Sequence, residues 1–298
     1  IDNISINLPR IALEIDRDYR DSSFEEKMQT LKKRWADVAG QVKDILIDRY
    51  EKVIGQTLDD FPTNRRFNLW GTRFDKAKDL EEIFKHGTLS IGFIGLSEAI
   101  EVLAGKKYYS DPSTLIATVG FVSYMREYCD FLRRETKLNF SLLATSGELI
   151  SGRFTEIDAK EFKPMSDIFS KGYYTNSFHV DVDSDLPAKK KIQIEGLVHP
   201  LCNGGSITYV ELGEAPLGND EGLLELIEEA IASNVHYLGF NFPKDVCDEC
   251  GASGVFDDCP CCGSKKITRI RRVSGYLEIL DGFTKGKKAE ERNRRRNG

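Results

Sequence analysis

The longest regular pattern of apolar and polar residues begins near residue 22 and runs beyond residue 50. Ser22-Ser23 followed by Glu25-Glu26 has the form of a capping box, in which side chains satisfy the first unpaired amides of a helix. Seven apolar residues then follow in steps of four and three, which puts them on one helix face: Phe24, Met28, Leu31, Trp35, Val38, Val42 and Ile45. A second apolar face begins at Leu46. We predict one long helix whose apolar stripe packs in the core.

Shorter patterns predict that helices and strands alternate along the rest of the chain. Further helices are expected at 96–103, at 114–134 and after the capping pair Asn219-Asp220. Strand-like runs occupy 4–13, 139–144, 174–182, 191–197, 206–212 and 235–242. A helix separates the last two runs, so they form a β-α-β unit, and the predicted fold class is α/β.

The composition is that of a soluble globular protein with room for about two domains of roughly 150 residues each. Apolar residues make up 40% of the 298 residues and charged residues 30%. No apolar run approaches the roughly 20 residues of a membrane span, and the N-terminus lacks a signal-peptide pattern. We therefore expect a cytoplasmic protein without a membrane partner. The first residue is Ile1, in strand-like sequence, which suggests that a preceding segment has been lost.

The net charge of −6 is spread unevenly. Residues 264–298 contain 12 basic and 4 acidic residues, whereas the first 263 contain 30 basic and 44 acidic ones. A basic terminal segment can contact nucleic acid, contact a partner or stay a solvated tail, and 290–296 has the pattern of a frayed helix end. The acidic remainder argues against phosphate binding by the whole chain, so nucleic acid is not the expected partner.

Five of the seven cysteines lie between residues 247 and 262. With an odd total and no secretory signal, a disulfide framework is not expected. Cys247-Asp248-Glu249-Cys250 and Cys259-Pro260-Cys261-Cys262 each place two thiolates where they can converge on one tetrahedral ion. Four sulfur ligands indicate a closed, structural zinc site of Cys247, Cys250, Cys259 and Cys262, because the two-residue spacing favours Cys262 over Cys261. A reactive dithiol pair is the alternative.

The residues that follow the cysteines change the interpretation. By pattern, Arg271-Arg272-Val273-Ser274-Gly275-Tyr276-Leu277 is a turn, since Ser-Gly is a common break. Its place after the cysteines, with Phe283-Thr284-Lys285-Gly286-Lys287 and Glu290 behind it, resembles the C-terminal glycyl-radical segment of the anaerobic (class III) ribonucleoside-triphosphate reductases. Four other blocks are similar to that family: Ser5-Ile6-Asn7-Leu8-Pro9-Arg10-Ile11, Ser90-Ile91-Gly92-Phe93-Ile94-Gly95-Leu96, Tyr173-Tyr174-Thr175-Asn176-Ser177-Phe178-His179 and Asn203-Gly204-Gly205. The resemblance runs nearly end to end.

The resemblance implies that Gly275 stores a radical. Loss of a Cα hydrogen leaves an unpaired electron delocalised into both flanking peptide groups, and glycine has no side chain to twist the backbone out of that plane. In the family an iron–sulfur activase that uses S-adenosylmethionine removes this hydrogen. The glycyl radical then oxidises a cysteine to a thiyl, which attacks the 3′ hydrogen of the ribonucleotide, so the protein carries chemistry usually left to a cofactor. By resemblance, the zinc site fixes the terminal domain so that Gly275 can enter the barrel.

The same resemblance implies a fold, a reaction and partners. Residues 1–243 would form the second half of a ten-stranded α/β barrel, and residues 244–298 a zinc-binding glycyl-radical domain. The implied reaction is the anaerobic reduction of ribonucleoside triphosphates to 2′-deoxyribonucleoside triphosphates for DNA synthesis. The implied partners are the activase, the nucleotide substrate and an identical subunit.

Part of the family pattern falls outside this sequence. In the family the thiyl-forming cysteine precedes the Asn-Leu-Pro-Arg block, which here begins at Asn7, so that cysteine would lie before Ile1. Cys129 and Cys202 lie in the wrong blocks to replace it. The N-terminal half of the barrel and the ATP-binding cone are also missing. We expect nucleotide reduction to need a complementing N-terminal part, and an inactive remnant of the reductase is the alternative.

Other candidate residues carry weaker signals. Glu148 follows the strand that ends near Thr145, where family members carry an active-site carboxylate, although a solvated loop glutamate has the same pattern. Asn176 and His179 fit a satisfied polar core pair. No phosphate-binding loop or dinucleotide fingerprint is present. A rival function from another class is that of a zinc-ribbon protein that binds nucleic acid through its basic tail.

Overall fold

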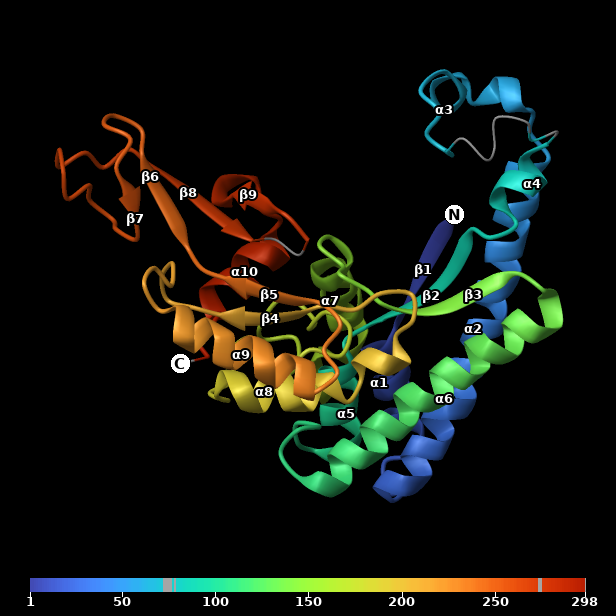
Figure 1. The fold of residues 1–298 in the computed structure, drawn as a ribbon. Coiled ribbons are helices and arrows are strands. Elements are labelled where there is room, and N and C mark those ends of the chain that lie inside the picture. Colours follow the sequence, from blue (N-terminus) through green and yellow to red (C-terminus); the bar gives the residue numbers. More distant parts are fainter. Residues whose placement is uncertain (72–76, 78, 273–274, 298) are drawn as a thin grey trace.

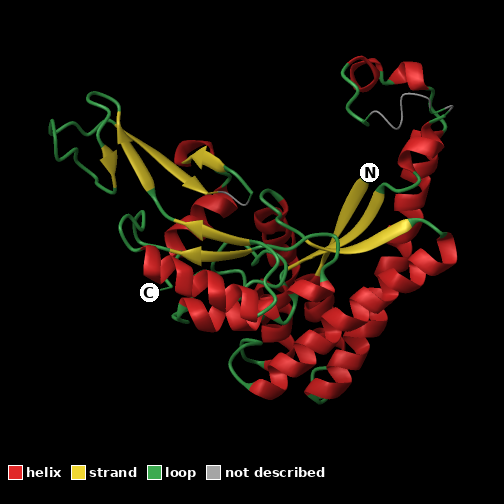
Figure 2. Cartoon of the chain, in the orientation of Figure 1, coloured by secondary structure: helices red, strands yellow, loops and turns green. Residues whose placement is uncertain are grey.

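Two small parallel sheets form the centre of the fold in the computed structural model, which describes residues 1–71, 77, 79–272 and 275–297 (Figure 1, Figure 2). The first sheet contains, in spatial order, β1 (Asp2–Asn7), β2 (Thr88–Ile94) and β3 (Asn139–Ala144). The second sheet pairs β4 (Thr208–Glu211) with β5 (Leu238–Asn241), and α9 (Asp220–Ala232) joins them. The β-α-β unit and the α/β class predicted from the sequence are confirmed.

The C-terminal part of the chain forms an antiparallel sheet, which we call the terminal sheet. Its strands are, in spatial order, β7 (Ser253–Gly254), β6 (Lys244–Cys247), β8 (Ile267–Arg272) and β9 (Leu277–Ile279). Figure 1 shows β6, β7 and the loops beside them pointing away from the parallel strands, whereas α10 (Lys285–Asn293) packs against α7 (Ile150–Phe162). The described strands lie in sheets of three, two and four, so the ten-stranded barrel expected from the resemblance is not confirmed.

The largest apolar cluster of the described residues lies where two long helices, α2 (Phe24–Ile54) and α6 (Pro112–Thr136), cross beside the three-stranded sheet. Trp35 of α2 is fully buried there and meets the rings of Phe121 and Tyr128 edge-on, at 6.4 and 5.4 Å between centroids. Next to the same sheet, α1 (Leu8–Asp18) packs against α5 (Leu96–Ala104). This core holds the three-stranded sheet, whereas β4 and β5 pack with α8 (Ala188–Gly196) and α9 in a separate, smaller apolar cluster.

The long helix has the predicted start, but its buried face differs from the predicted one. Ser23 caps it, and Glu26 completes the capping box by accepting a hydrogen bond from Ser23 N at 2.8 Å. The predicted positions recur every 3.5 residues, whereas an α-helix turns every 3.6 or so, and such a stripe drifts around the helix. The buried apolar positions are spaced slightly wider: Met28, Leu31, Trp35, Ala39, Val42, Leu46 and Tyr50. Ile45, which we expected in the core, is 45% exposed.

The apolar run at 4–13, predicted as one strand, is a strand followed by a helix. β1 ends at Asn7, and α1 carries Pro9 in its first turn, where a missing amide hydrogen costs nothing. Asn7 caps the helix by accepting a hydrogen bond from Arg10 N at 3.2 Å. A polar cap followed by proline is a helix-start signal, which the continuous apolar run concealed.

The run at 191–197, also predicted as a strand, belongs to the helix α8 (Ala188–Gly196). Its residues alternate between polar and apolar, which suggested one buried and one exposed strand face. However, Lys191 and Glu195 are both buried, because their charged groups find partners inside the protein. Lys191 Nζ, for example, donates a hydrogen bond to Tyr209 O at 2.6 Å. The alternation therefore did not report which residues face solvent.

Six further elements predicted from the sequence are present, one predicted strand is not, and several elements were not predicted. Segment 174–182, predicted as a strand, is irregular, and a single bridge joins its Asn176 to Ile94. The predicted elements that are present are α5, α6, α9, β3, β4 and β5. Elements without a predicted counterpart are β2, α3 (Pro62–Arg66), α4 (Leu80–Phe84), α7 and the terminal-sheet strands β6, β7, β8 and β9. Among the described residues, no helix combines the length and the apolar character that a membrane span requires.

Leu46→Ala and Ile45→Ala distinguish the observed helix register from the predicted one. Leu46 is fully buried, so its truncation leaves a cavity and lowers the free energy of unfolding by about 2–5 kcal/mol. Ile45 is 45% exposed, and we expect its truncation to change that free energy by no more than about 0.5 kcal/mol. Urea denaturation measures both values, and equal losses in the two variants would contradict the register.

Candidate functional site

Four thiols converge at the end of β6 and in the loops beside the terminal sheet, and we call them the four-cysteine cluster. The Sγ atoms of Cys247, Cys250, Cys259 and Cys262 all lie within 4.8 Å of one another. The Sγ atoms of Cys247 and Cys262 are 3.6 Å apart, as are those of Cys250 and Cys259. Tetrahedral zinc with Zn–S bonds of about 2.3 Å holds its sulfurs roughly 3.8 Å apart, so this donor set fits zinc. Cys261 is exposed and lies outside the cluster.

The two halves of the cluster are built alike. Gly251 N donates to Cys247 O at 2.9 Å, and Gly263 N donates to Cys259 O at the same distance. Both glycines have a positive φ, +75° and +73°, which residues with side chains adopt only at a cost. Backbone N–H groups, that of Cys262 first, lower the pKa of Cys259 to about 6 and so favour the thiolate that a metal binds.

The terminal sheet has little apolar core of its own. No apolar cluster of the described residues includes a residue beyond Phe240. The buried apolar or sulfur-containing side chains after that point are Cys247, Cys259 and Phe283. A segment that buries so little apolar surface needs another constraint, and the four-cysteine cluster would provide one if it held a metal.

Gly275 lies in the exposed turn between β8 and β9, whereas Val273 and Ser274 of the same segment lie outside the described residues. No described atom beyond its chain neighbours lies within 4 Å of the place that a Cβ on Gly275 would take. Packing against the described residues therefore does not require glycine at this position. In contrast, a Cβ on Gly286 would lie 2.8 Å from the Cα of Gly152, so Gly286 is needed for α10 to approach α7.

The residue after Gly275 connects the turn to the loop that follows β3. Tyr276 OH donates a hydrogen bond to Glu148 Oε2 at 2.9 Å. This contact raises the pKa of Tyr276, because the hydrogen bond to the carboxylate stabilises the protonated phenol. The negative charge of Glu148 also disfavours the phenolate. Glu148 is half-buried beside the turn, so it is not a freely solvated loop glutamate. The segments of two separate candidates from the sequence, Glu148 and Gly275, thus lie together.

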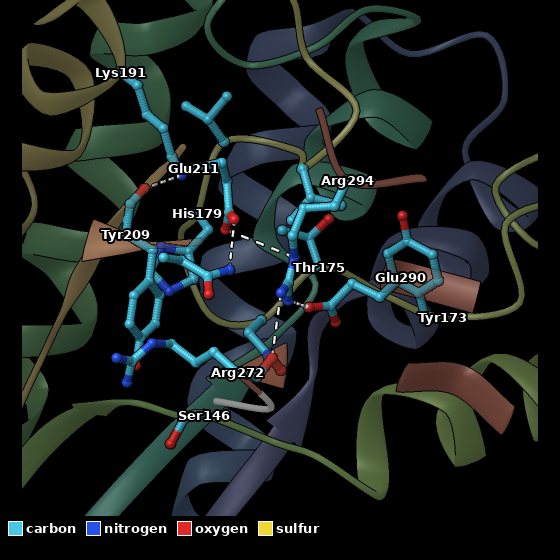
Figure 3. A pocket seen from close by; sticks show the side chains of 14 residues that line it. Ser146, Tyr173, Thr175, His179, Lys191, Tyr209, Glu211, Arg272, Glu290 and Arg294 are labelled. Atoms are coloured by element: carbon cyan, nitrogen blue, oxygen red, sulfur yellow. Dashed lines mark hydrogen bonds and ion pairs between the residues drawn. The ribbon is translucent and has the colours of Figure 1, made fainter. Parts of the chain in front are cut away.

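A pocket opens at the carboxyl ends of the parallel strands, and we call it the strand-end pocket (Figure 3). Glu211 and Asn241 are the last residues of β4 and β5, and Ser146 follows β3. Parallel α/β sheets bind their ligands outside this edge. Other residues of the lining include Asn176, His179, Tyr209, Arg272, Glu290 and Arg294.

Charged groups from distant parts of the chain meet on one side of this pocket, where Figure 3 shows Glu211, Glu290 and Arg294 directed toward one another. Arg294 Nη2 donates to Glu290 Oε1 at 2.9 Å, and Arg294 Nε lies 3.6 Å from Glu211 Oε1. Asn241 Nδ2 donates to Glu211 Oε2 at 2.5 Å. These contacts join the end of the chain to the ends of β4 and β5.

His179 is connected to a buried polar chain behind the pocket. His179 Nδ1 lies 3.3 Å from Glu195 Oε2, and Thr208 Oγ1 donates to the same oxygen at 2.6 Å. Thr208 Oγ1 lies 2.9 Å from His199 Nε2. His199 Nδ1 accepts a hydrogen bond from His236 N at 3.1 Å, so His199 is neutral with its proton on Nε2. Burial lowers the pKa of His199 to about 4.

The charged side of the strand-end pocket was not expected from the sequence. Glu290 and Arg294 belong to the stretch predicted as a frayed helix end, but Glu290 is 5% exposed and the Arg294 side chain 12%. The prediction was wrong, and the available signal was the spacing of opposite charges four residues apart. Asn176 and His179 are each satisfied, but by different partners: Asn176 Oδ1 accepts from Gly147 N at 3.1 Å.

Comparison with known proteins identifies relatives along almost the whole chain. A protein-family model described as anaerobic ribonucleoside-triphosphate reductase matches residues 1–296. The anaerobic ribonucleoside-triphosphate reductase of Escherichia coli (strain K12) is 34% identical over 310 residues, and that of Enterobacteria phage T4 is 30% identical over 301 residues. These matches cover 98% and 96% of this chain but 41% and 47% of the relatives, so the chain spans less than half of their length.

Solved structures show the same fold. An anaerobic ribonucleotide reductase superposes with a TM-score of 0.74 at 19% identity, over 98% of this chain and 44% of the other. The anaerobic ribonucleotide reductase from Thermotoga maritima in complex with dATP and CTP gives a TM-score of 0.69 at 20% identity, over 97% and 44%.

Cys262→Ser and Cys261→Ser test which thiols bind a metal. Cys262→Ser removes one of four donors, so we expect it to lose bound zinc and to unfold the terminal sheet locally. Cys261→Ser leaves the four-cysteine cluster whole, and we expect it to keep about one zinc ion per chain. Plasma mass spectrometry of the desalted proteins measures the metal. Zinc loss from the Cys261 variant, with retention in the Cys262 variant, would contradict this assignment.

The buried His199 predicts a pH dependence of stability. Its pKa in the folded chain, about 4, is below the ordinary value of 6.5, so the unfolded chain binds more protons between these values. The free energy of unfolding therefore falls as pH decreases from about 6.5 to 4. Thermal denaturation across this range measures it. We expect stability to fall less steeply with decreasing pH in His199→Gln than in the wild type. In His86→Gln, a change of an exposed histidine, we expect the wild-type pH dependence. The same pH dependence in His199→Gln and in the wild type would show that His199 is not its cause.

Proposed function

Because the chain belongs to the anaerobic ribonucleoside-triphosphate reductase family, we propose that it supplies the glycyl-radical part of such an enzyme. The observation that carries the proposal is a glycine at the family's radical position that the described packing does not require. Gly275 lies in an exposed turn, and its neighbour Tyr276 is bonded to the loop after β3. Steric packing with the described residues does not explain this glycine, whereas storage of a backbone radical would.

In this proposal Gly275 stores the radical. An activase of the S-adenosylmethionine radical type removes one Cα hydrogen, and the two flanking peptide groups share the unpaired electron. The exposure of the turn supports access for such a partner. The hydrogen bond from Tyr276 to Glu148 then keeps the turn beside the loop that leads to Ser146 in the strand-end pocket.

Cys247, Cys250, Cys259 and Cys262 would hold zinc in a structural role. Four thiolates complete the coordination of the ion, so it would offer no open position to a substrate. What the four residues contribute is a cross-link between two loops of a sheet that has little apolar core. The cross-link supports β8, the strand that leads toward Gly275.

The substrate of the complete enzyme would be a ribonucleoside triphosphate, reduced to the 2′-deoxyribonucleotide. We place it in the strand-end pocket, where the Arg272 guanidinium can oppose phosphate charge and His179 can form a hydrogen bond to the substrate. The five parallel strands would belong to one half of a ten-stranded barrel formed by residues 1–243, with residues 244–298 as the radical domain. The thiyl cysteine, the other half of the barrel and an identical subunit would come from outside this sequence.

The contacts of the basic tail do not favour the rival function of nucleic-acid binding. Arg294 is mostly buried among carboxylates, and Arg295 pairs with Asp185. Arg296 lies against Gly213, since a Cβ there would come within 2.5 Å of its guanidinium. Arginines that are already engaged by the protein are poor candidates for phosphate contacts.

Activation followed by exposure to air tests the proposal. The chain is incubated anaerobically with a family activase, a reductant and S-adenosylmethionine, and air is then admitted. In this family oxygen cuts the backbone at the radical glycine, so we expect intact-mass spectrometry to find a truncation at Gly275.

Gly275→Ala is the matched control, because the described surroundings of Gly275 have room for a methyl group. We expect this variant to fold, to bind the same metal and to stay uncut. A wild-type chain that is folded and metal-loaded but uncut would contradict the proposal, as would a cut at another residue.

A further inference from the structure

The basic end of the chain folds back into the protein, and we call residues 290–297 the C-terminal latch. Asn297 is 9% exposed and pairs with Glu211 at the end of β4. Asn297 N donates to Glu211 O, and Glu211 N donates to Asn297 Oδ1, both at 2.9 Å. Arg295 N donates to Val182 O at 2.8 Å. The latch is therefore held along its length by the body of the protein.

The same segment holds the end of β8. Arg294 Nη1 donates to Arg272 O at 3.2 Å, and Arg272 is the last residue of β8, three positions before Gly275. The preceding residue, Arg271, lies with its Nε 3.2 Å from Glu291 Oε1. Its Nη1 donates to the buried Asp245 at 2.7 Å. Arg271 and Arg272, the last two residues of β8 before Gly275, are thus held by contacts with the C-terminal latch and with β6.

Arg294 is the residue that links these two sets of contacts. Besides Arg272 O, its guanidinium contacts Glu290 and Glu291 at 2.9 Å each and lies 3.6 Å from Glu211. Its side chain is 12% exposed, so these carboxylates have little water to replace it. A planar guanidinium can face several acceptors at once, whereas a lysine ammonium is a single point charge.

We propose that Arg294 is a positioning residue for Gly275. It donates a hydrogen bond to the carbonyl of Arg272, and its guanidinium faces the Glu211 carboxylate at 3.6 Å, so it sets where the end of β8 lies relative to the strand-end pocket. In this proposal the Tyr276–Glu148 hydrogen bond depends on that placement, because Tyr276 follows the last residue of β8 by four positions. The inference rests on the proposed function for the role of Gly275, but the contacts themselves do not depend on it.

A fluorine label at position 276 tests the proposal. 3-Fluorotyrosine is incorporated at Tyr276 in the 298-residue chain, and the ¹⁹F chemical shift reports whether its hydroxyl is bonded. Glu148→Ala gives the reference for the unbonded state. We expect Arg294→Gln to lose the bonded resonance and to take the reference shift. Arg292→Gln, a change of an exposed arginine two positions earlier in α10, should keep the wild-type shift. Zinc content and circular dichroism verify that each variant is folded.

Asn297→Ala provides a milder change, should Arg294→Gln fail to fold. It removes the acceptor for Glu211 N and loosens the latch, so we expect partial loss of the bonded resonance. A wild-type shift in every folded variant of Arg294 and Asn297 would overturn the inference, as would loss of the bonded resonance in Arg292→Gln. No radical is needed for this measurement, so a chain that cannot be activated would contradict the proposed function and leave this result standing.

Discussion

The C-terminal part of the fold depends on the burial of carboxylates at the end of β4. Glu211 and Glu290 are 7% and 5% exposed, and an unpaired carboxylate at such a depth costs several kcal/mol. Although burial alone raises the pKa of Glu290, the neighbouring Lys287 and Arg294 outweigh it and leave that pKa below its ordinary value. The cations come from the last helix and the residue after it. The chain end therefore has to fold back onto the strand ends for the charges to be compensated.

The contacts among Glu211, Glu290, Glu291 and Arg294, which we call the charged seam, differ in kind from the apolar core around Trp35. Around Trp35 the contacts are apolar, and such packing is favourable in many slightly different arrangements. Along the seam, hydrogen bonds join one donor to one acceptor, as Arg294 Nη2 does with Glu290 Oε1, and ion pairs such as Arg294 with Glu211 lie beside them. Directional contacts specify geometry more than they add stability, because the cost of removing the charges from water offsets most of the attraction. The seam is suited to holding one turn in a defined place.

Much of the fold could be read from the sequence where local signals agreed. The capping box at Ser23 and the buried strand at 139–144 carry their own start and stop signals, and both are present. The secondary-structure predictions were wrong where charged residues are buried or an apolar residue is exposed. Lys191 and Glu195 are polar but buried, so the sequence of α8 resembled that of a strand. In α2, the pattern that repeats every seven residues predicted a buried Ile45, which is exposed. These outcomes depend on tertiary partners that a local pattern does not contain.

The candidate site divides in the same way. Cysteine spacing is a local signal, and the four thiols that it selected do converge. The glycine at 275 was identified by the order of its neighbours, which is also local. The strand-end pocket was not identified, because its lining comes from segments far apart in the sequence, such as Ser146, Tyr209 and Arg294. Only the topology of the parallel strands brings those side chains to one edge.

β8 shows how these constraints combine into one design. At its beginning, Ile267 pairs with Cys247, so this end is tied to the four-cysteine cluster. At its other end, Arg272 is bonded to Arg294 and so to the charged seam. Neither anchor uses an apolar core, yet the two together fix the strand at both ends. β8 is therefore held by the segment of the four-cysteine cluster at one end and by paired charges at the other, while a Cβ on Gly275 would meet no described atom beyond its chain neighbours.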